Sequence, residues 1–586
     1  MCGIFGYIGQ KENAAATILN GLKTLEYRGY DSWGIAVGNG RTLDHEKHVG
    51  KISQARVSLP LSTFGIGHTR WATHGGVTDA NAHPHLSCDA KIALVHNGIV
   101  ENYQKLRKTL QRNHKITSET DTEIIVHLIE EESKKTKKLD DAVRAAFKKL
   151  TGLNAIVVLF PGGQITVAKN GSPLVLGISN KEYFVASDPA ALLPHTQKVI
   201  FLEDNQLASV GNGGIKVFEA ESGKGVKPKV QSLQWEVKQA KLGKFEHFML
   251  KEIFEQPKVI RNIAENYSEQ INNLANVIKR ARGTFFIGCG TASYAALAGQ
   301  YLFSRVASIH VNFSIGSEFN YLEHYLNDKS LVIAISQSGE TIDVVEPVSN
   351  AKKKGAKVVA LTNVLGSTLY RLADHKILLG AGPEVAVCAT KSFIAMVSIL
   401  VYLAYEMNGE GQKAKKLLTK AAQNVELMLK DSYLDNIKKL AKKIYQKEHL
   451  YIIGRGLSYA TSLEATLKLK EVPYIHSEGF AGGELKHGVI ALIENGTPTI
   501  VFAPKDETHE AIISNAIEIK ARGGYIIGIG PENNEAFDYY LPTFDVEDAS
   551  IITNVVPAQL LAYFLALNKG LEPDKPRNLA KSVTVK

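Results

Sequence analysis

Cysteine is scarce in this chain, and its spacing excludes two classes of protein. The 586 residues contain four cysteines, at positions 2, 88, 289 and 388, with no CxxC pair. This spacing excludes a disulfide framework and a cysteine-rich zinc site, and it is typical of a reducing compartment. We therefore expect a cytoplasmic protein that holds no metal.

Long apolar runs and a large excess of one charge are also absent. No apolar run reaches the roughly 18 residues of a membrane span, and the N-terminus lacks the basic and then apolar pattern of a secretion signal. The net charge of +9 is modest, and the lysines are not interleaved with aromatic residues. We expect neither a membrane protein nor a nucleic-acid-binding protein. The length and the 45% hydrophobic content predict a globular protein of about two to four domains.

Cys2 follows the initiator methionine at the head of an apolar run. If Met1 is removed, a thiol and an α-amine share one carbon. The amine titrates near ~7.7–8.0 and the thiol near ~8.5, so the amine can accept or relay the thiol proton. A buried, inert cysteine is the structural alternative. The position of Cys2 leaves both interpretations open.

The first 210 residues are rich in short β-like runs, with a few helical patterns between them. The runs are Gly34–Val37, Lys91–Val95, Asn154–Phe160, Gln164–Ala168, Tyr183–Ala186 and Leu207–Val210, and the helical patterns lie around 13–26, 102–112, 121–134 and 139–150. Because strands outnumber helices without strict alternation, we predict stacked sheets with helices outside. A Gly- and Lys-rich stretch around 211–244 is typical of a connector.

The second half alternates long helical patterns with short apolar strands, which is typical of a parallel, doubly wound sheet. It also repeats itself. Three pairs of similar segments lie 166 to 168 residues apart, beginning at Thr284 and Leu450, at Leu331 and Pro498, and at Lys354 and Arg522. We interpret this as two copies of one α/β unit, of which only the first carries a serine-rich loop.

That loop is Ser336-Gln337-Ser338-Gly-Glu-Thr341, which follows the strand Leu331–Ile335 and precedes a helical pattern. Hydroxyl groups and free backbone N–H groups at a helix N-terminus make a phosphate-binding site. The turn Gly288–Ser293, which contains Thr291, lacks the third glycine of a dinucleotide fingerprint and the lysine of a P-loop. Ordinary helix N-caps are the alternative, and we expect a sugar-phosphate site at these strand ends.

Three further segments carry candidate proton-transfer groups. Glu464, Lys468 and Glu471 share one helix face, either as an exposed salt-bridge ladder or as the carboxylate and lysine of a proton transfer beside a carbonyl. His487 lies in a glycine-bounded turn, where an imidazole can move protons. Lys581 lies in a tail that is too short to form a core. Each of these segments is open to a structural interpretation.

The first half contains the parts of an amino-acid site. Arg70 can bind a carboxylate through two parallel hydrogen bonds, and Asn97 with the N–H of Gly98 can form an oxyanion hole. Asp121 can hold an ammonium group or cap the helix that follows it. With a terminal cysteine, these residues describe a site where a thiolate attacks the side-chain amide of an α-amino acid.

Five motifs carry a resemblance to a known family: Met1–Ile4, Tyr27–Ser32, Gly67–Gly75, His96–Gly98 and Ser118–Glu123. They resemble the N-terminal-nucleophile glutaminase domain of class II amidotransferases, while the second half resembles paired sugar isomerase domains. The whole chain, including the tail string Pro576–Val585, is similar to the family of isomerising glutamine–fructose-6-phosphate aminotransferases.

The resemblance implies an α/β fold, with an αββα glutaminase sandwich followed by two tandem doubly wound sugar isomerase domains. The expected limits are 1–215 for the amidotransferase domain, 216–244 for a linker, 245–425 and 426–575 for the isomerase domains, and 576–586 for an active-site tail. The implied reaction converts fructose 6-phosphate and glutamine to glucosamine 6-phosphate and glutamate, the first step of amino-sugar (UDP-N-acetylglucosamine) synthesis. It needs no cofactor.

The resemblance also implies residue roles. Cys2 is the expected nucleophile, Asn97 and Gly98 the oxyanion hole, Arg70 and Asp121 the anchors of glutamine, and Trp71 the gate of an ammonia channel. His74 and Thr291 are expected to contact substrate, and Ser336, Gln337, Ser338 and Thr341 to hold the phosphate. In the isomerase half Lys581 forms a Schiff base, Glu471 and Lys468 shuttle the proton, and His487 opens the sugar ring. In the family this histidine comes from the partner subunit, which implies a homodimer.

A few positions depart from the commonest family pattern, and two other functions remain open. Ala292, Ala386 and Ala389 replace small polar residues or glycine, and Trp33 replaces a small residue. The first alternative is an amidotransferase that aminates a phosphorylated keto-sugar without isomerising it, which Glu471 and Lys581 argue against. The second is a sugar-phosphate-binding regulatory protein, which an intact Cys2 argues against. The connector is too short for a large regulatory insertion.

Overall fold

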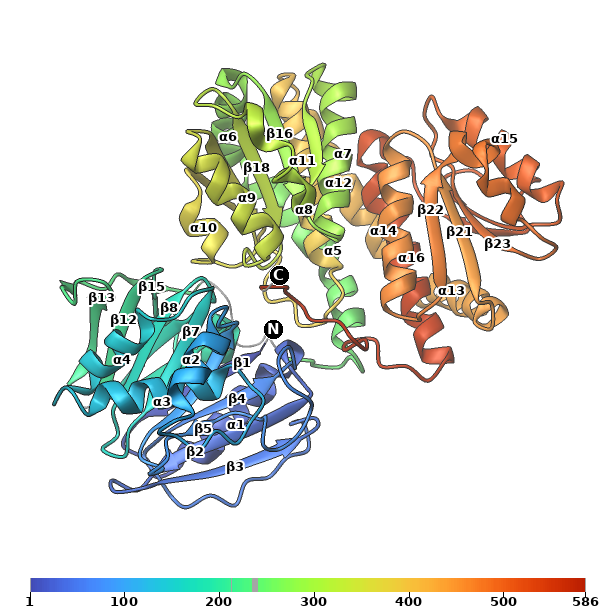
Figure 1. Ribbon diagram of the computed structural model, residues 1–586. Coiled ribbons are helices and arrows are strands. Elements are labelled where there is room, and N and C mark those ends of the chain that lie inside the picture. The colour runs from blue at the N-terminus through green and yellow to red at the C-terminus, as the bar shows by residue number, and fades with distance from the viewer. Residues whose placement is uncertain (1, 212, 234–240, 585–586) are drawn as a thin grey trace. The chain divides into compact units, whose positions relative to one another are not determined.

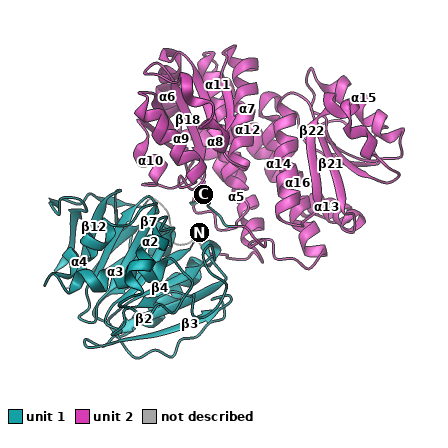
Figure 2. Ribbon diagram, viewed as in Figure 1, with its two compact units in different colours: residues 1–240, 580–586 teal, residues 241–579 magenta. Residues whose placement is uncertain are grey.

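The structure, a computed structural model, describes residues 2–211, 213–233 and 241–584 (Figure 1). The chain divides into two compact units (Figure 2). Unit 1 comprises residues 1–240 with 580–586, and unit 2 comprises residues 241–579.

Unit 1 is built on two antiparallel sheets. The eight-stranded sheet has the order β15-β11-β9-β10-β1-β4-β2-β3, and the seven-stranded sheet has the order β14-β13-β12-β8-β7-β6-β5. The first sheet contains β1 (Gly3–Ile8), β2 (Ser32–Gly38), β3 (Leu43–Val49), β4 (Phe64–Arg70), β9 (Val175–Ser179), β10 (Glu182–Ala186), β11 (Lys198–Phe201) and β15 (Val230–Ser232). The second contains β5 (His85–Leu86), β6 (Ala93–Gly98), β7 (Asn154–Leu159), β8 (Ile165–Asn170), β12 (Gln206–Gly211), β13 (Gly214–Glu219) and β14 (Gly225–Val226).

The core of unit 1 lies between these sheets, with helices on both outer faces. Inward side chains such as Ile4 and Ile66 of the first sheet pack with Val95 and Val157 of the second. Helix α1 (Ala14–Thr24) covers the first sheet, and α2 (Tyr103–Leu110), α3 (Thr122–Ser133) and α4 (Leu139–Phe147) cover the second. The predicted αββα sandwich is therefore confirmed.

Part of the expected linker 216–244 belongs to these sheets. Most of β13, together with β14 and β15, lies in that range. β13 and β14 pair in the seven-stranded sheet, and β15 pairs with β11 in the eight-stranded sheet. Glycine and lysine dominate the composition of the stretch, but alternating residues such as Val217 and Val226 still face apolar neighbours. Composition alone therefore hides short edge strands. Residues 234–240 of the same range lie outside the described residues.

Unit 2 contains two parallel five-stranded sheets with the same strand order. The first runs β17-β16-β18-β19-β20 and the second β22-β21-β23-β24-β25. Their strands are β16 (Thr284–Gly288), β17 (Asn312–Ile315), β18 (Leu331–Ser336), β19 (Lys357–Thr362), β20 (His375–Leu378), β21 (His449–Gly454), β22 (His476–Ala481), β23 (Pro498–Phe502), β24 (Tyr525–Gly530) and β25 (Tyr539–Pro542). In both sheets the first strand lies between the second and the third, which is a doubly wound order.

Most of the long helices of unit 2 form a shared layer between the two sheets (Figure 1). One apolar cluster includes Phe286 and Ile333 of the first sheet and Ile452 and Ile500 of the second. The layer contains α5 (Phe248–Asn266), α6 (Ser268–Arg280), α7 (Thr291–Leu302), α11 (Lys391–Met407), α12 (Gly411–Met428), α13 (Asp431–Ile444), α14 (Leu457–Glu471) and α16 (Ser550–Asn568). The outer faces carry α8 (Gly316–Phe319), α9 (Ile342–Lys353), α10 (Thr368–Leu372) and α15 (His509–Lys520).

The predicted repeat is visible in the backbone. Gly290 and Gly456 precede α7 and α14 with nearly the same dihedral angles, φ 54° and ψ −129° against φ 53° and ψ −128°. A positive φ of this kind favours glycine. The same turn therefore leads from the first strand to the first helix in both copies.

Among the described residues, one helix is long and apolar enough to cross a membrane, by length and composition only. It spans Glu547–Asn568 and includes the 19-residue α16, which contains no charged residue. In the structure 94% of its most apolar window is buried inside the protein. A core helix of a globular domain passes the same test, and its place in the shared layer accounts for its composition.

Candidate active sites at Cys2 and at the sheet edge of unit 2

The half-buried Cys2 lies immediately before β1, beside the end of β4. The backbone N–H of Trp71 donates to the Cys2 Sγ at 3.3 Å, and the Cys2 carbonyl accepts from Nδ2 of Asn97 at 3.0 Å. The close approach of the strands explains Gly3, because a Cβ there would lie 2.5 Å from Oγ1 of Thr69. The fold therefore holds Cys2 at a strand end, with the N–H of Trp71 at its sulfur and the NH₂ group of Asn97 at its carbonyl oxygen.

The orientation of Asn97 is fixed by a buried histidine. Nε2 of His68 lies 3.1 Å from Oδ1 of Asn97 and 3.1 Å from the carbonyl oxygen of His96. Both partners are acceptors, so this network assigns the proton to Nε2. Burial lowers the pKa of His68 to about 3, which keeps the ring neutral at physiological pH. With its oxygen engaged, Asn97 turns its NH₂ group toward Cys2.

Gly98 continues the same strand end with a backbone that other residues avoid. Its φ is 136°, and a Cβ would lie 2.1 Å from the carbonyl oxygen of Leu153. Only glycine fits this position without a backbone shift. The structure thus brings together three of the predicted residues, Cys2, Asn97 and Gly98.

Arg70 shapes a loop near this site. Its guanidinium donates to the carbonyl oxygens of His74, Gly75 and Gly76, the last two at 3.1 and 3.0 Å. The loop is fixed from its other side by Glu119, whose carboxylate accepts from the N–H of Gly76 at 3.0 Å. Burial lowers the pKa of Arg70, although the neighbouring Cys2, Asp31 and Asp121 favour its charged form. The anchoring of a substrate carboxylate by Arg70 stays a prediction.

Asp121 occupies the N-cap position of α3 but does not cap the helix through its side chain. Its Oδ2 accepts instead from the N–H of Val100 at 2.7 Å. The simple capping alternative is therefore not supported. Trp71 and His74 are half-buried, and His74 packs its ring edge on Tyr103 at 5.3 Å between centroids.

In unit 2 the candidate loops lie at the switch point of the first sheet. The turn Gly288–Ser293 follows β16 and the loop Ser336–Thr341 follows β18, and these strands are neighbours. In this strand order the crevice between the first and third strands is where open α/β sheets bind ligands. The equivalent edge of the second sheet carries neither serine of the loop.

The loop Ser336–Thr341 leads into the 12-residue helix α9. Oγ of Ser336 accepts from the N–H of Gly339 at 3.0 Å, and Oγ of Ser338 accepts from the N–H of Glu340 at 3.2 Å. Gly339 has a φ of 65°, and a Cβ there would lie 2.1 Å from Oγ of Ser367. The tight turn concentrates hydroxyl and amide groups at the positive end of a helix.

Lys468 of α14 is fully buried between two carboxylates. Its Nζ lies 2.6 Å from Oε2 of Glu471 and 3.5 Å from Oε1 of Glu464, and it donates to Oγ1 of Thr291 at 3.2 Å. Thr291 in turn donates to Glu464 at 3.3 Å. Because Thr291 begins α7, this network joins the first repeat to the second at the ligand edge. An exposed salt-bridge ladder is excluded, since Glu464 and Lys468 are 0% exposed and Glu471 is 20% exposed.

This burial changes the protonation of the group. Burial raises the pKa of Glu464 to about 7, with Glu471 adding to the shift and Lys468 opposing it. Burial alone would lower the pKa of Lys468, but Glu464 and Glu471 outweigh it and raise the pKa above its usual value. Lys468 therefore stays charged. From the sequence Glu464 is only one member of a helix face, and its place in the site is identified by the buried contact with α7.

His487 and Lys581 belong to other segments of the chain than this group. His487 is exposed at the end of the helical turn Gly482–His487, and within the described chain its side chain has no hydrogen bond or ion pair. Lys581 is half-buried and belongs to the segment 580–586, which groups with unit 1. The chain ahead of it is fixed, because the carboxylate of Asp574 accepts from the N–H groups of Phe248 and Met249, each at 2.7 Å. The roles of His487 and Lys581 stay predictions.

The positions that depart from the family pattern are accommodated in the fold. Trp33 is buried in β2, with its ring 4.8 Å from that of His48. Ala292 and Ala386 are also buried, and the N–H of Ala386 donates to Glu252 at 3.2 Å. Nothing in the structure explains Ala389.

Comparisons with known proteins agree with this geometry. A glutamine amidotransferase domain family matches residues 68–194, and the SIS domain family matches residues 277–405 and 443–569. The glutamine–fructose-6-phosphate aminotransferases (isomerising) of Thermococcus kodakarensis and Pyrococcus horikoshii are 43% and 42% identical to this chain, each over 100% of both chains.

Solved structures resemble the second half of the chain. The C-terminal domain of glucosamine-fructose-6-phosphate aminotransferase from Francisella tularensis has a TM-score of 0.53 and 29% identity, covering 57% of this chain and 99% of that one. A putative phosphosugar isomerase from Silicibacter pomeroyi has a TM-score of 0.50 and 24% identity, covering 56% and 100%, and shows the fold alone.

Proposed function

Because the chain belongs to the family of isomerising glutamine–fructose-6-phosphate aminotransferases, we propose that unit 1 releases ammonia from glutamine and that unit 2 uses it. In unit 2 the ammonia aminates and isomerises fructose 6-phosphate. The products are glucosamine 6-phosphate and glutamate. This places the chain at the first step of amino-sugar (UDP-N-acetylglucosamine) synthesis, in the cytoplasm.

The proposed glutaminase step begins at Cys2 after Met1 has been removed. The thiolate attacks the side-chain amide carbon of glutamine, and the α-amine of Cys2 takes the thiol proton and passes it to the leaving ammonia. The NH₂ group of Asn97, oriented by His68, and the N–H of Gly98 donate to the oxyanion. Water then hydrolyses the thioester, which releases glutamate and restores the thiol.

The remaining groups near Cys2 bind and enclose the substrate in this proposal. Arg70 binds the α-carboxylate of glutamine and Asp121 binds the α-ammonium group. Both residues are buried. Trp71, whose N–H already contacts the Cys2 sulfur, covers the site and controls the passage of ammonia. His74 contributes a further substrate contact from the loop that Arg70 holds.

The proposed isomerase step takes place at the switch point of the first sheet. Ser336, Gln337, Ser338 and Thr341 hold the phosphate at the start of α9, and His487 opens the sugar ring. Lys581 forms a Schiff base at C2 with loss of water, and ammonia replaces the lysine amine there. Glu471 then removes a proton from C1 and returns one to C2, which yields the amino aldose. Thr291 borders the substrate and fixes Lys468.

The observation that carries isomerisation is the pair formed by Glu471 and Lys468. A partly exposed carboxylate 2.6 Å from a buried ammonium, at the ligand edge of a sugar isomerase fold, suits proton transfer beside a carbonyl. An amidotransferase that does not isomerise its substrate has no use for this pair. A regulatory protein has no use for a nucleophile at Cys2.

We further propose that the chain acts as a homodimer, with His487 supplied by the partner subunit. Its exposed position, apart from the group on α14, supports this assignment. Large apolar side chains are also exposed in unit 2, at Ile315, Tyr321, Leu322 and Tyr325. The molar mass measured by light scattering distinguishes a dimer from the 64.0 kDa monomer.

The proposed function is tested by mixing the purified protein with glutamine and fructose 6-phosphate. We expect glucosamine 6-phosphate and glutamate to form in equal amounts. Glutamate without amino sugar would contradict the proposed coupling. Amination of the keto-sugar without its conversion to an aldose would favour the non-isomerising alternative.

Replacing Asn97 by aspartate tests the oxyanion hole. The side chain keeps its shape, but it loses the NH₂ donor that faces Cys2 and gains a negative charge. We expect the glutaminase kcat to fall by about 10²–10³-fold, as when one oxyanion donor is removed, while ammonia-dependent synthesis is retained. The assay measures glutamate release. A kcat within about twofold of wild type would rule out this role for Asn97.

Replacing Gly339 by alanine tests the phosphate loop. The left-handed backbone costs about 1–2 kcal/mol for a residue with a Cβ, and the new methyl group would contact Ser367. We expect the KM for fructose 6-phosphate to rise at least about tenfold, since 1.4 kcal/mol is a factor of ten, with glutaminase activity unchanged. Gly409→Ala is the matched control, because Gly409 has a φ of 78° but no neighbour within 4 Å. An equal effect of both variants on this KM would contradict the prediction.

A further inference from the structure

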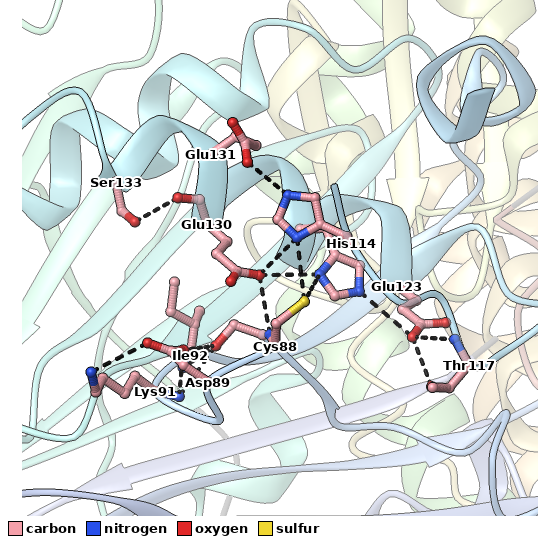
Figure 3. Close-up of polar contacts among 12 residues, drawn as sticks. Cys88, Asp89, Lys91, Ile92, His114, Thr117, Glu123, Glu130, Glu131 and Ser133 are labelled. Atoms are coloured by element: carbon pink, nitrogen blue, oxygen red, sulfur yellow. Dashed lines mark hydrogen bonds and ion pairs between the residues drawn. The ribbon is translucent and has the colours of Figure 1, made fainter. Parts of the chain in front are cut away.

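Four potential metal ligands converge in unit 1, at a place the proposed reaction does not use (Figure 3). Cys88 lies in the turn between β5 and β6, and His114 lies in the loop after α2. His127 and Glu130 lie one turn apart on α3. Each residue offers one ligand atom, and the four atoms lie within 4.8 Å of one another.

The spacing of these atoms matches a tetrahedral metal site. The Sγ of Cys88 lies 3.4 Å from Nδ1 of His114 and 3.8 Å from Nδ1 of His127. The Oε2 of Glu130 lies 3.2 Å from each of the same two nitrogens. Bonds of about 2.0–2.3 Å from zinc to nitrogen, oxygen and sulfur give tetrahedral edges of about 3.3–3.6 Å. Four of the six edges are thus already close to those of a zinc site.

The outer nitrogen of His114 is hydrogen-bonded to a carboxylate, and that of His127 faces one beyond hydrogen-bond distance, which is an observation independent of the ligand spacing. Nε2 of His114 lies 2.8 Å from Oε1 of Glu131, and Nε2 of His127 lies 3.6 Å from Oε1 of Glu123. Histidines that bind metals usually donate their other N–H to a carboxylate or carbonyl, which fixes the tautomer and the ring orientation. Both rings therefore present Nδ1 toward the centre of the cluster.

The cluster is also rich in negative charge, since Glu123, Glu130 and Glu131 surround the two imidazoles. If each Nε2 carries its proton toward Glu131 or Glu123, both Nδ1 atoms present lone pairs toward the thiol and the carboxylate of Glu130. The thiol proton can satisfy only one of these acceptors. A divalent cation at the centre would bind all four atoms and balance the surrounding carboxylates.

We propose that Cys88, His114, His127 and Glu130 bind a divalent transition-metal ion of the zinc class. Four protein ligands without an open position make the site structural rather than catalytic. The ion joins the turn at Cys88, the loop at His114 and helix α3. The segment 114–121 leads from His114 to Asp121. The N–H groups of Thr117 and Ser118 in this segment donate to the carboxylate of Glu123 at 2.8 and 2.6 Å, so the ion and Glu123 together order it. The sequence predicts no metal, because its four cysteines are widely spaced and form no CxxC pair.

Metal content of the full-length protein provides the first test. After incubation with Zn²⁺ and removal of free metal, we expect about one zinc per chain by elemental analysis. With Co²⁺ in its place, we expect the visible absorption of tetrahedral cobalt and a near-ultraviolet charge-transfer band from a thiolate ligand. These measurements need no variant. Wild-type protein that retains no zinc, or a cobalt complex without the thiolate band, would overturn the proposal.

Two variants and a matched control locate the ion. Cys88→Ser replaces an exposed residue, so the fold is retained, and it should remove the thiolate band and weaken zinc binding on the order of 100-fold or more. Glu131→Gln replaces the carboxylate partner of His114 by a neutral amide and also removes the ion pair with Lys134, and it should weaken binding by about 10–100-fold. Glu132→Gln on the same helix is the control, because Glu132 pairs instead with Lys135 and Lys149 at 2.8 and 2.5 Å. Equal zinc affinity in Cys88→Ser and Glu132→Gln would place any bound ion elsewhere and refute the assignment.

Discussion

Cys2→Ala abolishes glutamine hydrolysis and glutamine-dependent synthesis, and leaves the isomerase reaction intact. We expect the glutaminase kcat to fall on the order of 10⁴-fold or more, as when the nucleophile of a covalent mechanism is removed. Alanine keeps the small second residue that permits removal of Met1, so only the thiol is lost. Asn97 keeps its contacts with His68 and with the backbone carbonyl of residue 2, whereas the N–H of Trp71 loses the sulfur as its acceptor.

The two halves of the reaction separate this effect from misfolding. Glutamate release measures unit 1, and interconversion of fructose 6-phosphate and glucose 6-phosphate measures unit 2. We expect ammonium salts to restore synthesis in Cys2→Ala, because they bypass the glutaminase step. Full activity of this variant with glutamine would disprove Cys2 as the nucleophile, and the intact mass of the wild-type protein shows whether Met1 is removed.

Lys468→Met destabilises unit 2 by about 3–5 kcal/mol, which is the usual result of removing one partner of a buried ion pair. Methionine fills much of the volume, but Glu464 at 0% exposure then has no cation beside it. We also expect isomerase activity to fall on the order of 10²-fold or more, because Glu471 loses the group that orients it. Glutaminase activity should stay near that of wild type, since its residues lie in unit 1.

The stability that Lys468→Met loses relative to wild type should grow with pH. The folded pKa of Glu464 is about 7, above its usual 4.5, so the wild type loses stability as the pH rises from about 4.5 to about 7. Without Lys468 the pKa of Glu464 rises further, and this loss extends to higher pH. Chemical denaturation should therefore show a larger difference between Lys468→Met and wild type at pH 9 than at pH 6.

Two comparisons make this prediction specific. Lys470→Met alters an exposed lysine on the same helix, and should change the unfolding free energy by less than about 0.5 kcal/mol. Adding Glu464→Gln to Lys468→Met removes the uncompensated carboxyl, so the double variant should recover part of the lost stability. A difference from wild type that does not depend on pH would mean that Glu464 is not the group that titrates.

The fold class could be predicted because the periodicity of each half is local. The alternation of strands in the first half and of helices and strands in the second is visible within short windows, and the comparisons and the observed sheets confirm both. The strands β14 and β15 were not expected, since two or three residues in a polar stretch carry too little pattern. Their formation depends on pairing with β13 and β11.

The site could be predicted only in part, because its decisive contacts are remote in sequence. The alternation of charge along α14 is compatible with an exposed ladder, and only the packing of α7 against it buries Lys468. Asp121 occupies a position typical of an N-cap, yet its partner is Val100 in another segment. Cys88 and His127 are 39 residues apart, so neither spacing nor composition indicated that they meet.

The shared helical layer of unit 2 makes its two repeats depend on each other. In α11, 16 of 17 residues are buried, and in α16 17 of 19, so neither helix has a face suited to water. A precursor with one repeat would have exposed this apolar layer, and could have been soluble only by associating with a second copy. The two repeats therefore depend on each other, and each contributes its own polar groups: the first the serine loop, the second Lys468 and Glu471.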